Sequence, residues 1–290
     1  ANTEISIVSE NDSNKIVMKT ENGEYKLSCE PSDNYPTISS FKASEEIKIN
    51  NETLKRLITK TSFAVSSDEL RPAMMGVLLQ MKKNEIRAVA TDGHRLVRLV
   101  NTSFSSPKVE REIIIPAKAL ILALKSFENS DSTVSFNDTH VMFSLGSITL
   151  ISRMIEEKYP NYESVIPIDN DKRLIVDKEQ LIASVRRTAL YASSTTHQVR
   201  FSLKKGSMAV SAEDIDFGSE AKETLTCDYS SEPMEIGFNA SYIIDILSHV
   251  DTNDVLIMLS TPTRACIIKP SDQHTAENLL MLVMPVRLNT

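Results

Sequence analysis

The stretch "INNETLKRLITKTSF" (49–63) decides the fold, because "IVDKEQLIASVRRTAL" (175–190) repeats its pattern later in the chain. In the first stretch, apolar residues recur at the i, i+3, i+4, i+7 spacing of an amphipathic helix. Three positions coincide between the two stretches at an offset of 127 residues. They are Leu54, Ile58 and Thr61, paired with Leu181, Val185 and Thr188. The match indicates an internal repeat.

Further matches follow in the same order. "NEIRAVATD" (84–92) matches "GSMAVSAED" (206–214) at an offset of 122, and "EIIIPAKALILAL" (112–124) matches "EIGFNASYIIDIL" (235–247) at an offset of 123. "NYPTI" (34–38) stands 124 residues before the corresponding part of "KYPNY" (158–162). A strand-turn-strand pattern precedes each of these, at 5–29 and 132–152. The landmarks predict repeated domains of about 123 residues, a normal domain size.

This spacing divides the chain into three parts. Residues 44–166 and 167–290 each cover one complete unit, while 1–43 resembles the back end of a unit whose front is missing. We therefore expect a truncated form of a protein with roughly three such units.

Each unit is predicted to be an α+β domain with two helices packed on antiparallel sheet. The strands alternate apolar and polar residues, as at Ile5-Ile7 and Val134-Phe136, which is typical of a half-buried antiparallel sheet. Asn51, Asp177 and Asn239 are candidate helix N-caps, because their side-chain oxygens can accept hydrogen bonds from the amides of a first turn.

The composition excludes several classes of protein. With 290 residues, 41% of them hydrophobic, the chain can bury a substantial core. The three cysteines lie far apart without a CxxC pair, which predicts free thiols in a reducing cytoplasm and neither a zinc site nor a disulfide framework. The longest apolar run, 113–124, contains Lys118 and is too short to span a bilayer. We expect a cytoplasmic protein that does not enter a membrane.

Charge is distributed unevenly between the predicted helices and the rest of the chain. The four helical segments (50–66, 116–127, 177–191 and 239–249) sum to +4, although the whole chain carries −7, so the remainder carries −11. Cations on the outer helix faces suit non-specific contact with a phosphate backbone. The alternative is an ordinary solvated helix face. The candidate residues in the helices are Lys55, Arg56, Lys60, Lys118, Lys125, Arg186 and Arg187.

The stretch "ATDGHRLV" (90–97) is the part of the chain that most resembles a reactive site. A metal site would need further ligands, but the other histidines stand singly without an HxxxH or HExxH pair. No GxSxG, GxxxxGK[ST] or GxGxxG motif is present, and the adjacent acids Glu45-Glu46 and Glu156-Glu157 would face opposite sides of a strand. From the residues alone, Asp92-Gly93 is best interpreted as a turn after a strand, with glycine supplying a positive φ.

Four motifs together give a specific resemblance. "VATDGHRL" (89–96), "YPNYESVIP" (159–167), "MEIGFNASYIIDIL" (234–247) and "VMPVRL" (283–288) resemble the bacterial β sliding clamp family in order and spacing. The resemblance covers the whole chain. It implies three domains per subunit and two subunits in a head-to-tail ring, with helices lining the hole and sheets outside.

The resemblance also implies partners and a site. The partners would be duplex DNA, a second copy of the chain when full length, and the catalytic subunit of DNA polymerase III, the clamp loader and repair proteins through short hydrophobic peptides. No catalysis, metal or cofactor is implied, and Arg71 would lie on a loop that can touch DNA. The implied peptide pocket comprises Met74, Thr91, Gly93, His94, Arg95, Leu96, Pro160, Val165, Asn239, Tyr242, Thr263, Leu282, Met284, Pro285, Val286 and Arg287. In it, apolar side chains would hold Leu or Phe anchors, while His94, Arg95 and Asn239 would hydrogen-bond the peptide.

This sequence departs from the family pattern at several positions. Ser164 stands where arginine is frequent, Met74 replaces the usual leucine, and Pro72-Ala73 replace bulkier residues beside Arg71. Two alternatives stay open. One is an enzyme that uses Asp92 and His94, and the other is a DNA-binding or scaffold protein that forms no ring. With most of the first domain absent, we also expect that this chain does not close a normal ring.

Overall fold

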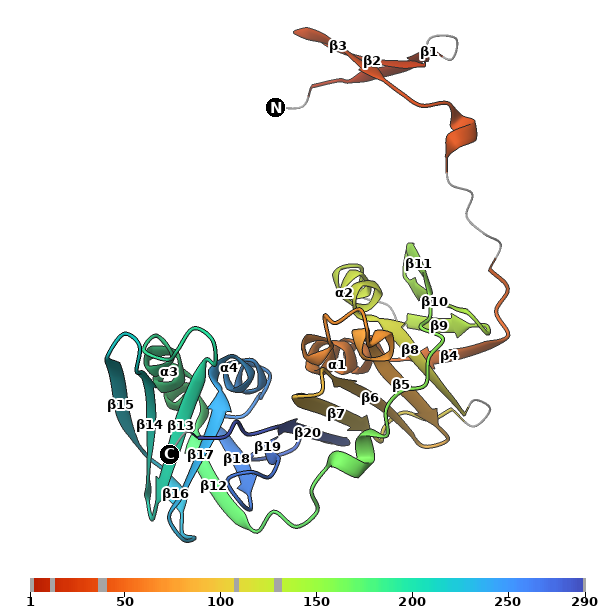
Figure 1. Ribbon diagram of the computed structural model, residues 1–290. Coiled ribbons are helices and arrows are strands. Elements are labelled where there is room, and N and C mark those ends of the chain that lie inside the picture. The colour runs from red at the N-terminus through yellow and green to blue at the C-terminus, as the bar shows by residue number, and fades with distance from the viewer. Residues whose placement is uncertain (1–2, 11–13, 36–40, 107–109, 128–131, 289–290) are drawn as a thin grey trace. The chain divides into compact units, whose positions relative to one another are not determined.

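The computed structural model describes residues 3–10, 14–35, 41–106, 110–127 and 132–288. It divides into two units, 1–41 and 42–290 (Figure 1). Part of the "NYPTI" match lies outside the described residues.

The unit formed by residues 1–41 contains a small antiparallel sheet. Its strands β1 (Ser6–Glu10), β2 (Lys15–Thr20) and β3 (Gly23–Ser28) lie in chain order, followed by a 3-10 turn at Ser32–Asn34. These strands agree with the strand-turn-strand pattern expected at 5–29. Val17 is buried, whereas Ile7, Tyr25 and Leu27 are exposed, so this sheet covers little apolar surface by itself.

Residues 42–290 contain the same order of elements twice. The first set is β4 (Glu45–Ile49), α1 (Asn51–Thr61), β5 (Gly76–Lys82), β6 (Glu85–Thr91), β7 (Arg95–Asn101), β8 (Arg111–Pro116), α2 (Ala117–Lys125), β9 (Ser132–Phe136), β10 (His140–Leu145) and β11 (Ile148–Arg153). The second is β12 (Lys172–Asp177), α3 (Lys178–Ala189), β13 (Gln198–Lys204), β14 (Ser207–Asp214), β15 (Ser219–Thr226), β16 (Asp228–Tyr229), β17 (Met234–Asn239), α4 (Ala240–Ser248), β18 (Asp254–Leu259), β19 (Cys266–Pro270) and β20 (Glu277–Val283). Among the described helices and strands of this unit, only β16 lacks a counterpart. The predicted fold class, repeated α+β domains with two helices on antiparallel sheets, is confirmed.

The two repeats share one sheet. Nine strands run in the order β16-β12-β18-β19-β20-β7-β6-β5-β8, and two four-stranded sheets have the orders β11-β10-β9-β4 and β15-β14-β13-β17. The repeats meet where β20 pairs antiparallel with β7, from Glu277 opposite Asn101 to Val283 opposite Arg95 (Figure 1). The sequence did not predict this junction.

Two apolar cores lie on opposite faces of the shared sheet. The helix-side core includes Leu54 of α1, Leu120 of α2 and inward-facing residues of β5 to β7. The outer core includes Leu78, Leu96 and Leu282 and is covered by the linker that carries Tyr159 and Tyr162. The alternation of β-strand side chains therefore supplies both cores, one from each face.

The helix starts agree with the sequence at two of three positions. Asp177 caps α3 by accepting from the Gln180 amide, and Asn239 caps α4. The prediction for α1 is wrong by one residue, because Asn50, not Asn51, accepts from the Glu52 and Thr53 amides. No helix in the described part of the chain is long and apolar enough to cross a membrane.

Candidate functional site

The turn at 91–95 is held by its own side chains. Asp92 Oδ1 accepts hydrogen bonds from the backbone amides of His94 and Arg95, both at 2.9 Å. Thr91 Oγ1 accepts from the Gly93 amide at 3.1 Å and donates to the Arg95 carbonyl at 2.7 Å. Gly93 has a φ of +91°, which favours glycine. The predicted Asp92-Gly93 turn is confirmed, and the Asp92 carboxylate is used to build it.

Arg95 joins this turn to the second repeat. Its side chain is largely buried, and all three of its nitrogens donate within the protein. Nε donates to Asp92 Oδ2 at 3.1 Å, Nη1 to Asp245 Oδ2 of α4 at 2.6 Å and Nη2 to the Phe63 carbonyl at 3.0 Å. The guanidinium also lies 4.8 Å from the centre of the Tyr242 ring. Three of the five guanidinium N–H groups are therefore used within the protein, one of them across the repeats to Asp245, while the expected hydrogen bond from Arg95 to a peptide stays a prediction.

His94 lies beside the C-terminal strand. Its carbonyl accepts a hydrogen bond from the Met284 amide at 2.8 Å, and its ring centre is 6.0 Å from that of Tyr242, with the ring planes 18° apart. Asn239 Oδ1 accepts from the amides of Ser241 and Tyr242, so this oxygen serves the helix start. The structure thus brings together residues from three of the quoted motifs.

Apolar side chains of the expected pocket differ in their exposure. Leu96 and Leu282 are opposite each other across the junction and only 2% exposed, so they support the site from beneath. Met284 is 40% exposed and available to a ligand. Met74, Pro285 and Val286 are partly buried, and the Val286 amide donates to the Gly237 carbonyl at 2.9 Å.

The remaining expected pocket residues lie on neighbouring segments. Pro160 and Val165 are exposed on the linker, Thr263 is exposed in the turn between β18 and β19, and Arg287 is exposed in the C-terminal segment. Within the described residues, no hydrogen bond or ring contact ties any of these four side chains to His94.

The sequence did not predict a cluster of charged residues where the two repeats meet. It consists of Arg56, Lys60, Asp251 and Glu277, and we call it the seam. Arg56 of α1 forms a bidentate ion pair with Glu277 of β20, in which Nε and Nη2 lie 2.8 and 2.7 Å from the two carboxylate oxygens. Nη2 also lies 2.9 Å from Asp251 Oδ2. Lys60 donates to Asp251 and to the His249 carbonyl. Burial opposes ionisation of Asp251, but hydrogen bonds from Lys60 and Arg56 outweigh it and hold its pKa below the usual value.

The prediction that the side chains of Lys60 and Arg56 face DNA is therefore corrected. Lys60 is only 6% exposed, and Arg56 is directed at carboxylates of the second repeat. The helical wheel placed both opposite Leu54, but the face opposite Leu54 is partly covered by the loop at 249–251 and by β20. Partners so distant in sequence gave no local signal.

The other candidate cations have varied surroundings. Arg187 forms a bidentate ion pair with Glu223, with both nitrogen–oxygen distances 2.6 Å. Arg71 forms an ion pair with Asp68 beside the Gly93 turn. Lys55 lies over the Phe127 ring. The residues that stand exposed on the helices without an ion pair to another described residue are Lys118, Lys125 and Arg186. Among the residues that the structure describes, no group of three or more histidine, cysteine, aspartate or glutamate side chains could hold a metal ion.

Comparison with known proteins gives the same assignment as the motifs. The family described as DNA polymerase III beta subunit, central domain, matches residues 48–161, and the family described as DNA polymerase III beta subunit, C-terminal domain, matches residues 163–287. The beta sliding clamp of Pseudomonas aeruginosa is 30% identical over 277 residues, covering 94% of this chain and 74% of that protein. The chain belongs to the beta sliding clamp family. The beta sliding clamp of Pseudomonas putida is 29% identical over 279 residues, covering 96% of this chain and 75% of its own length.

Solved sliding clamps share the fold over nearly the whole chain. A DNA polymerase sliding clamp from Pseudomonas aeruginosa superposes with a TM-score of 0.90 at 28% identity, covering 99% of this chain and 77% of that one. A sliding clamp from Bartonella birtlesii, bound to griselimycin, superposes with a TM-score of 0.91 at 27% identity, with the same coverage. The resemblance stated from the four motifs is confirmed. In this clamp, the two matched domains adjoin in the linker that covers the outer core.

Proposed function

We propose that this chain works as a DNA sliding clamp, which tethers partner proteins to duplex DNA by encircling it and holding their short clamp-binding peptides. Residues 44–166 and 167–290 would be the middle and C-terminal clamp domains, and 1–43 would belong to the first. The chain would make and break no bond and use no cofactor. Its partners in the bacterial cytoplasm would be the catalytic subunit of DNA polymerase III, the clamp loader and repair proteins.

One observation carries the peptide-binding part of this proposal. The hydrogen bond from the Met284 amide to the His94 carbonyl places two distant motifs side by side, with Tyr242 against the His94 ring. The exposed thioether of Met284 and the ring of Tyr242 can take apolar anchors, because methionine adapts to varied shapes. Arg95 would position the site by fixing the turn against α4.

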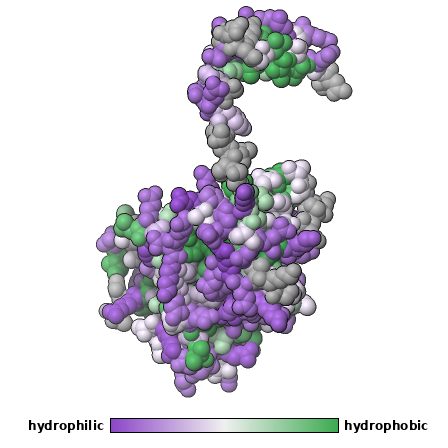
Figure 2. Space-filling view, turned by 90° about the vertical axis from the view of Figure 1, so that its right-hand side faces the viewer, coloured by the Kyte–Doolittle hydropathy of each residue, from purple (hydrophilic) through white to green (hydrophobic). Residues whose placement is uncertain are grey.

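The exposed helix cations support loose contact with DNA. Lys118 and Lys125 on α2 and Arg186 on α3 lie on helices that Figure 1 shows along one side of the unit formed by residues 42–290. Contacts to phosphates carry no sequence information and weaken with salt, which suits a protein that slides. The face of this unit seen in Figure 2 is mainly hydrophilic, with small separate apolar areas.

An unpaired strand edge supports assembly with a second subunit. Strand β7 pairs with β20 of the next repeat, but its counterpart β15 pairs only with β14 among the described strands. The turn before β15 exposes Ile215 and Phe217. We propose that a strand of a second subunit adds to β15 much as β20 adds to β7, which would join the two subunits head to tail.

Titration of a fluorescent peptide carrying adjacent Leu and Phe anchors tests the peptide site. We expect saturable anisotropy, displacement by griselimycin, and a dissociation constant raised about tenfold by Met284→Ala, because truncation removes an apolar contact. Ile148→Ala on β11, at 42% exposure, is the matched control and should change nothing. Absence of saturable binding, or equal effects of the two variants, would contradict the proposal.

A DNA-binding or scaffold protein that forms no ring would hold linear DNA as strongly as closed circles, whereas a clamp slides off free ends.

A further inference from the structure

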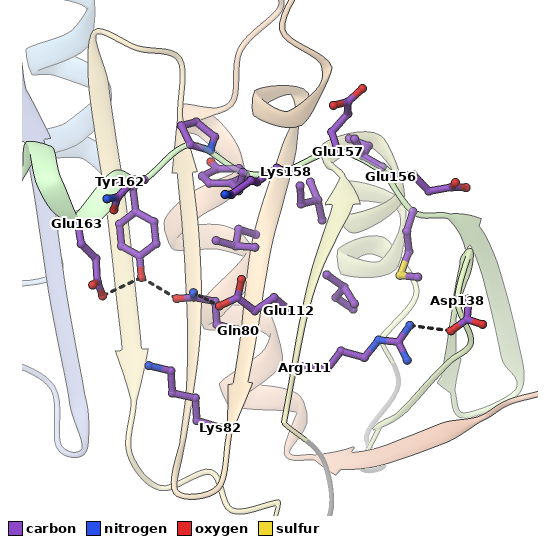
Figure 3. A pocket seen from close by; sticks show the side chains of 18 residues that line it. Gln80, Lys82, Arg111, Glu112, Asp138, Glu156, Glu157, Lys158, Tyr162 and Glu163 are labelled. Atoms are coloured by element: carbon purple, nitrogen blue, oxygen red, sulfur yellow. Dashed lines mark hydrogen bonds and ion pairs between the residues drawn. The ribbon is translucent and has the colours of Figure 1, made fainter.

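A hollow of about 730 Å³ lies in the first repeat of the 42–290 unit, on the sheet face that points away from α1 and α2 (Figure 3). We call it the outer hollow. It is bounded by Leu78 and Gln80 of β5, Glu112 and Ile114 of β8, the β9–β10 turn and segment 154–163. None of the expected clamp-peptide residues except Pro160 borders it.

The base of the outer hollow is apolar and well packed. Leu78 and Ile114 are both less than a tenth exposed, and Ile155, Tyr159 and Tyr162 pack against them in the outer core. A base of this kind can accept the methylene stem of a long side chain while its polar end stays near the rim.

A fixed chain of hydrogen bonds crosses the hollow. The Tyr162 hydroxyl donates to Gln80 Oε1 at 2.6 Å, and Gln80 Nε2 donates to Glu112 Oε1 at 2.6 Å (Figure 3). An ionised carboxylate can only accept, so the amide group of Gln80 must face Glu112. Glu112 is thereby held in place with lone pairs left over for an incoming donor.

The charge around the outer hollow favours a cationic guest. Five carboxylates and three cations line it, and the Arg111 cation is already taken by Glu45 and Asp138. Glu163 is paired with Arg87. In the described part of the chain, no cation lies within ion-pair distance of Glu112, whose only hydrogen-bond donor is Gln80.

The second repeat contains the same carboxylate in the same setting. Glu235 corresponds to Glu112 at the repeat offset of 123, and both stand opposite equivalent residues of the neighbouring strand, Ser202 and Gln80. Ser202 donates to Glu235 Oε1 at 2.7 Å, as Gln80 does to Glu112. Glu235 also borders a hollow, of about 580 Å³.

The second repeat supplies its own cation at this point, and the first does not. Arg200 places Nη1 3.5 Å from Glu235 Oε2. The counterpart of Arg200 is Leu78, since the two stand opposite the equivalent positions Gly237 and Ile114. The first repeat therefore keeps the carboxylate but has an apolar residue in place of the arginine.

We propose that the outer hollow binds an arginine side chain of a partner polypeptide, with its guanidinium on Glu112 and its stem over Leu78 and Ile155. Within the same chain, Arg200 shows an arginine at the equivalent position, 3.5 Å from Glu235 and 3.7 Å from Glu213. A guanidinium is preferred to an ammonium because its flat fork can donate to a carboxylate through two parallel hydrogen bonds. The inference does not depend on the proposed clamp function.

Two-dimensional NMR of the isotope-labelled chain with short peptides tests the proposal. The probe is acetylated, amidated Gly-Leu-Arg-Leu-Gly, and the comparison peptide has glutamine in place of arginine. We expect saturable shifts of the Gln80 side-chain amide with the arginine peptide alone. Glu112→Gln should weaken that binding at least about tenfold, because a charged hydrogen-bond acceptor is lost.

Three further variants sharpen the result. Glu235→Gln, the same change at the equivalent position, and Met284→Ala, in the proposed clamp-peptide site, should leave the dissociation constant unchanged. Arg200→Leu should create a second set of saturable shifts around Glu235. Equal shifts with the glutamine peptide, full binding by Glu112→Gln, or no second site in Arg200→Leu would each overturn the proposal.

Discussion

The two repeats have the same order of elements, but corresponding strands have different neighbours. In the first repeat β7 lies inside the nine-stranded sheet, whereas β15 in the second lies at a sheet edge. Leu96 of β7 stands opposite Thr91, and Glu220 of β15 stands opposite the equivalent Glu213. Leu96 is buried under the linker and Glu220 is exposed. The two repeats therefore share one backbone arrangement, whereas the polarity of corresponding side chains depends on whether another segment covers the strand.

The outer faces differ for the same reason. Leu78 and Ile114 of the first repeat belong to the covered outer core, but Arg200 and Gly237 take their places in the second. At Gly237 the C-terminal segment approaches so closely that an added Cβ would lie 2.8 Å from the Val286 carbonyl oxygen. A repeated fold thus retains its helix-side core and varies the opposite face.

The largest effect should come from removing a side chain that only one repeat buries. Leu96→Ala should lower the free energy of unfolding by about 3 kcal/mol, because it leaves a cavity in the outer core beneath the linker. Glu220→Ala, at the equivalent exposed position, should change it by less than about 0.5 kcal/mol. Urea unfolding followed by circular dichroism measures both. Similar losses in the two variants would remove the distinction between a covered and an open strand.

A second contrast concerns two arginine–carboxylate pairs. Arg56 and Glu277 join the repeats, and the Glu277 side chain is only 3% exposed, whereas Arg187 and Glu223 form their pair at the surface of the second repeat. Glu277→Ala should cost about 3 kcal/mol, since Arg56 then keeps a partly buried charge with Asp251 alone. Glu223→Ala should cost less than about 1 kcal/mol, because water screens the exposed pair.

The same urea experiment at low and high salt sharpens this contrast. The small contribution of Glu223 should fall further at 1 M salt, while the loss caused by Glu277→Ala should persist. If Glu277→Ala proved as mild as Glu223→Ala, the seam would not hold the repeats together.

The sequence predicted what each repeat contains and missed how the repeats join. Helical and alternating patterns, the turn at Asp92-Gly93 and the caps at Asp177 and Asn239 depend on neighbours a few residues away, so local patterns reveal them. The β7–β20 junction and the Arg56–Glu277 pair depend on which strand edges meet, and no local pattern encodes that. Lys60 was misplaced for this reason: helical periodicity identifies the side opposite the core but not a second domain lying against it.

The residues of the candidate site also divide into those that the sequence identified and those that it missed. The resemblance identified His94, Tyr242 and Met284, which the structure brings together. Asp245 and Phe63 were missed, although both contact the Arg95 guanidinium. One signal was available, because Asp245 is the only charged residue in the segment 240–248. A lone carboxylate in such a helix indicates a partner from outside the helix.

The smallest effect should be a pH dependence carried by His249 in the seam. The His249 ring stacks on the Phe63 ring with centres 3.8 Å apart. Burial lowers the pKa of His249, and the nearby cations Lys60 and Arg95 also oppose its protonation. A hydrogen bond to the Asp245 carbonyl partly offsets this lowering. The unfolded chain therefore binds a proton more readily than the folded chain. The stability contributed by neutral His249 is fully present above about pH 6.5, the usual histidine value, and is lost as the pH falls from there through the lowered folded-state pKa.

Urea unfolding at pH 7.5 and 5.5 measures this contribution. The wild-type chain should lose more stability between the two pH values than His249→Gln does, while His140→Gln on β10, away from the seam, should behave like the wild type. Asp251 titrates below this window, because its lowered pKa lies under that of an ordinary aspartate, so it does not obscure the comparison. Equal losses in all three proteins would show that His249 is no more enclosed than a surface histidine, and would weaken the view that this seam is packed like a domain interior.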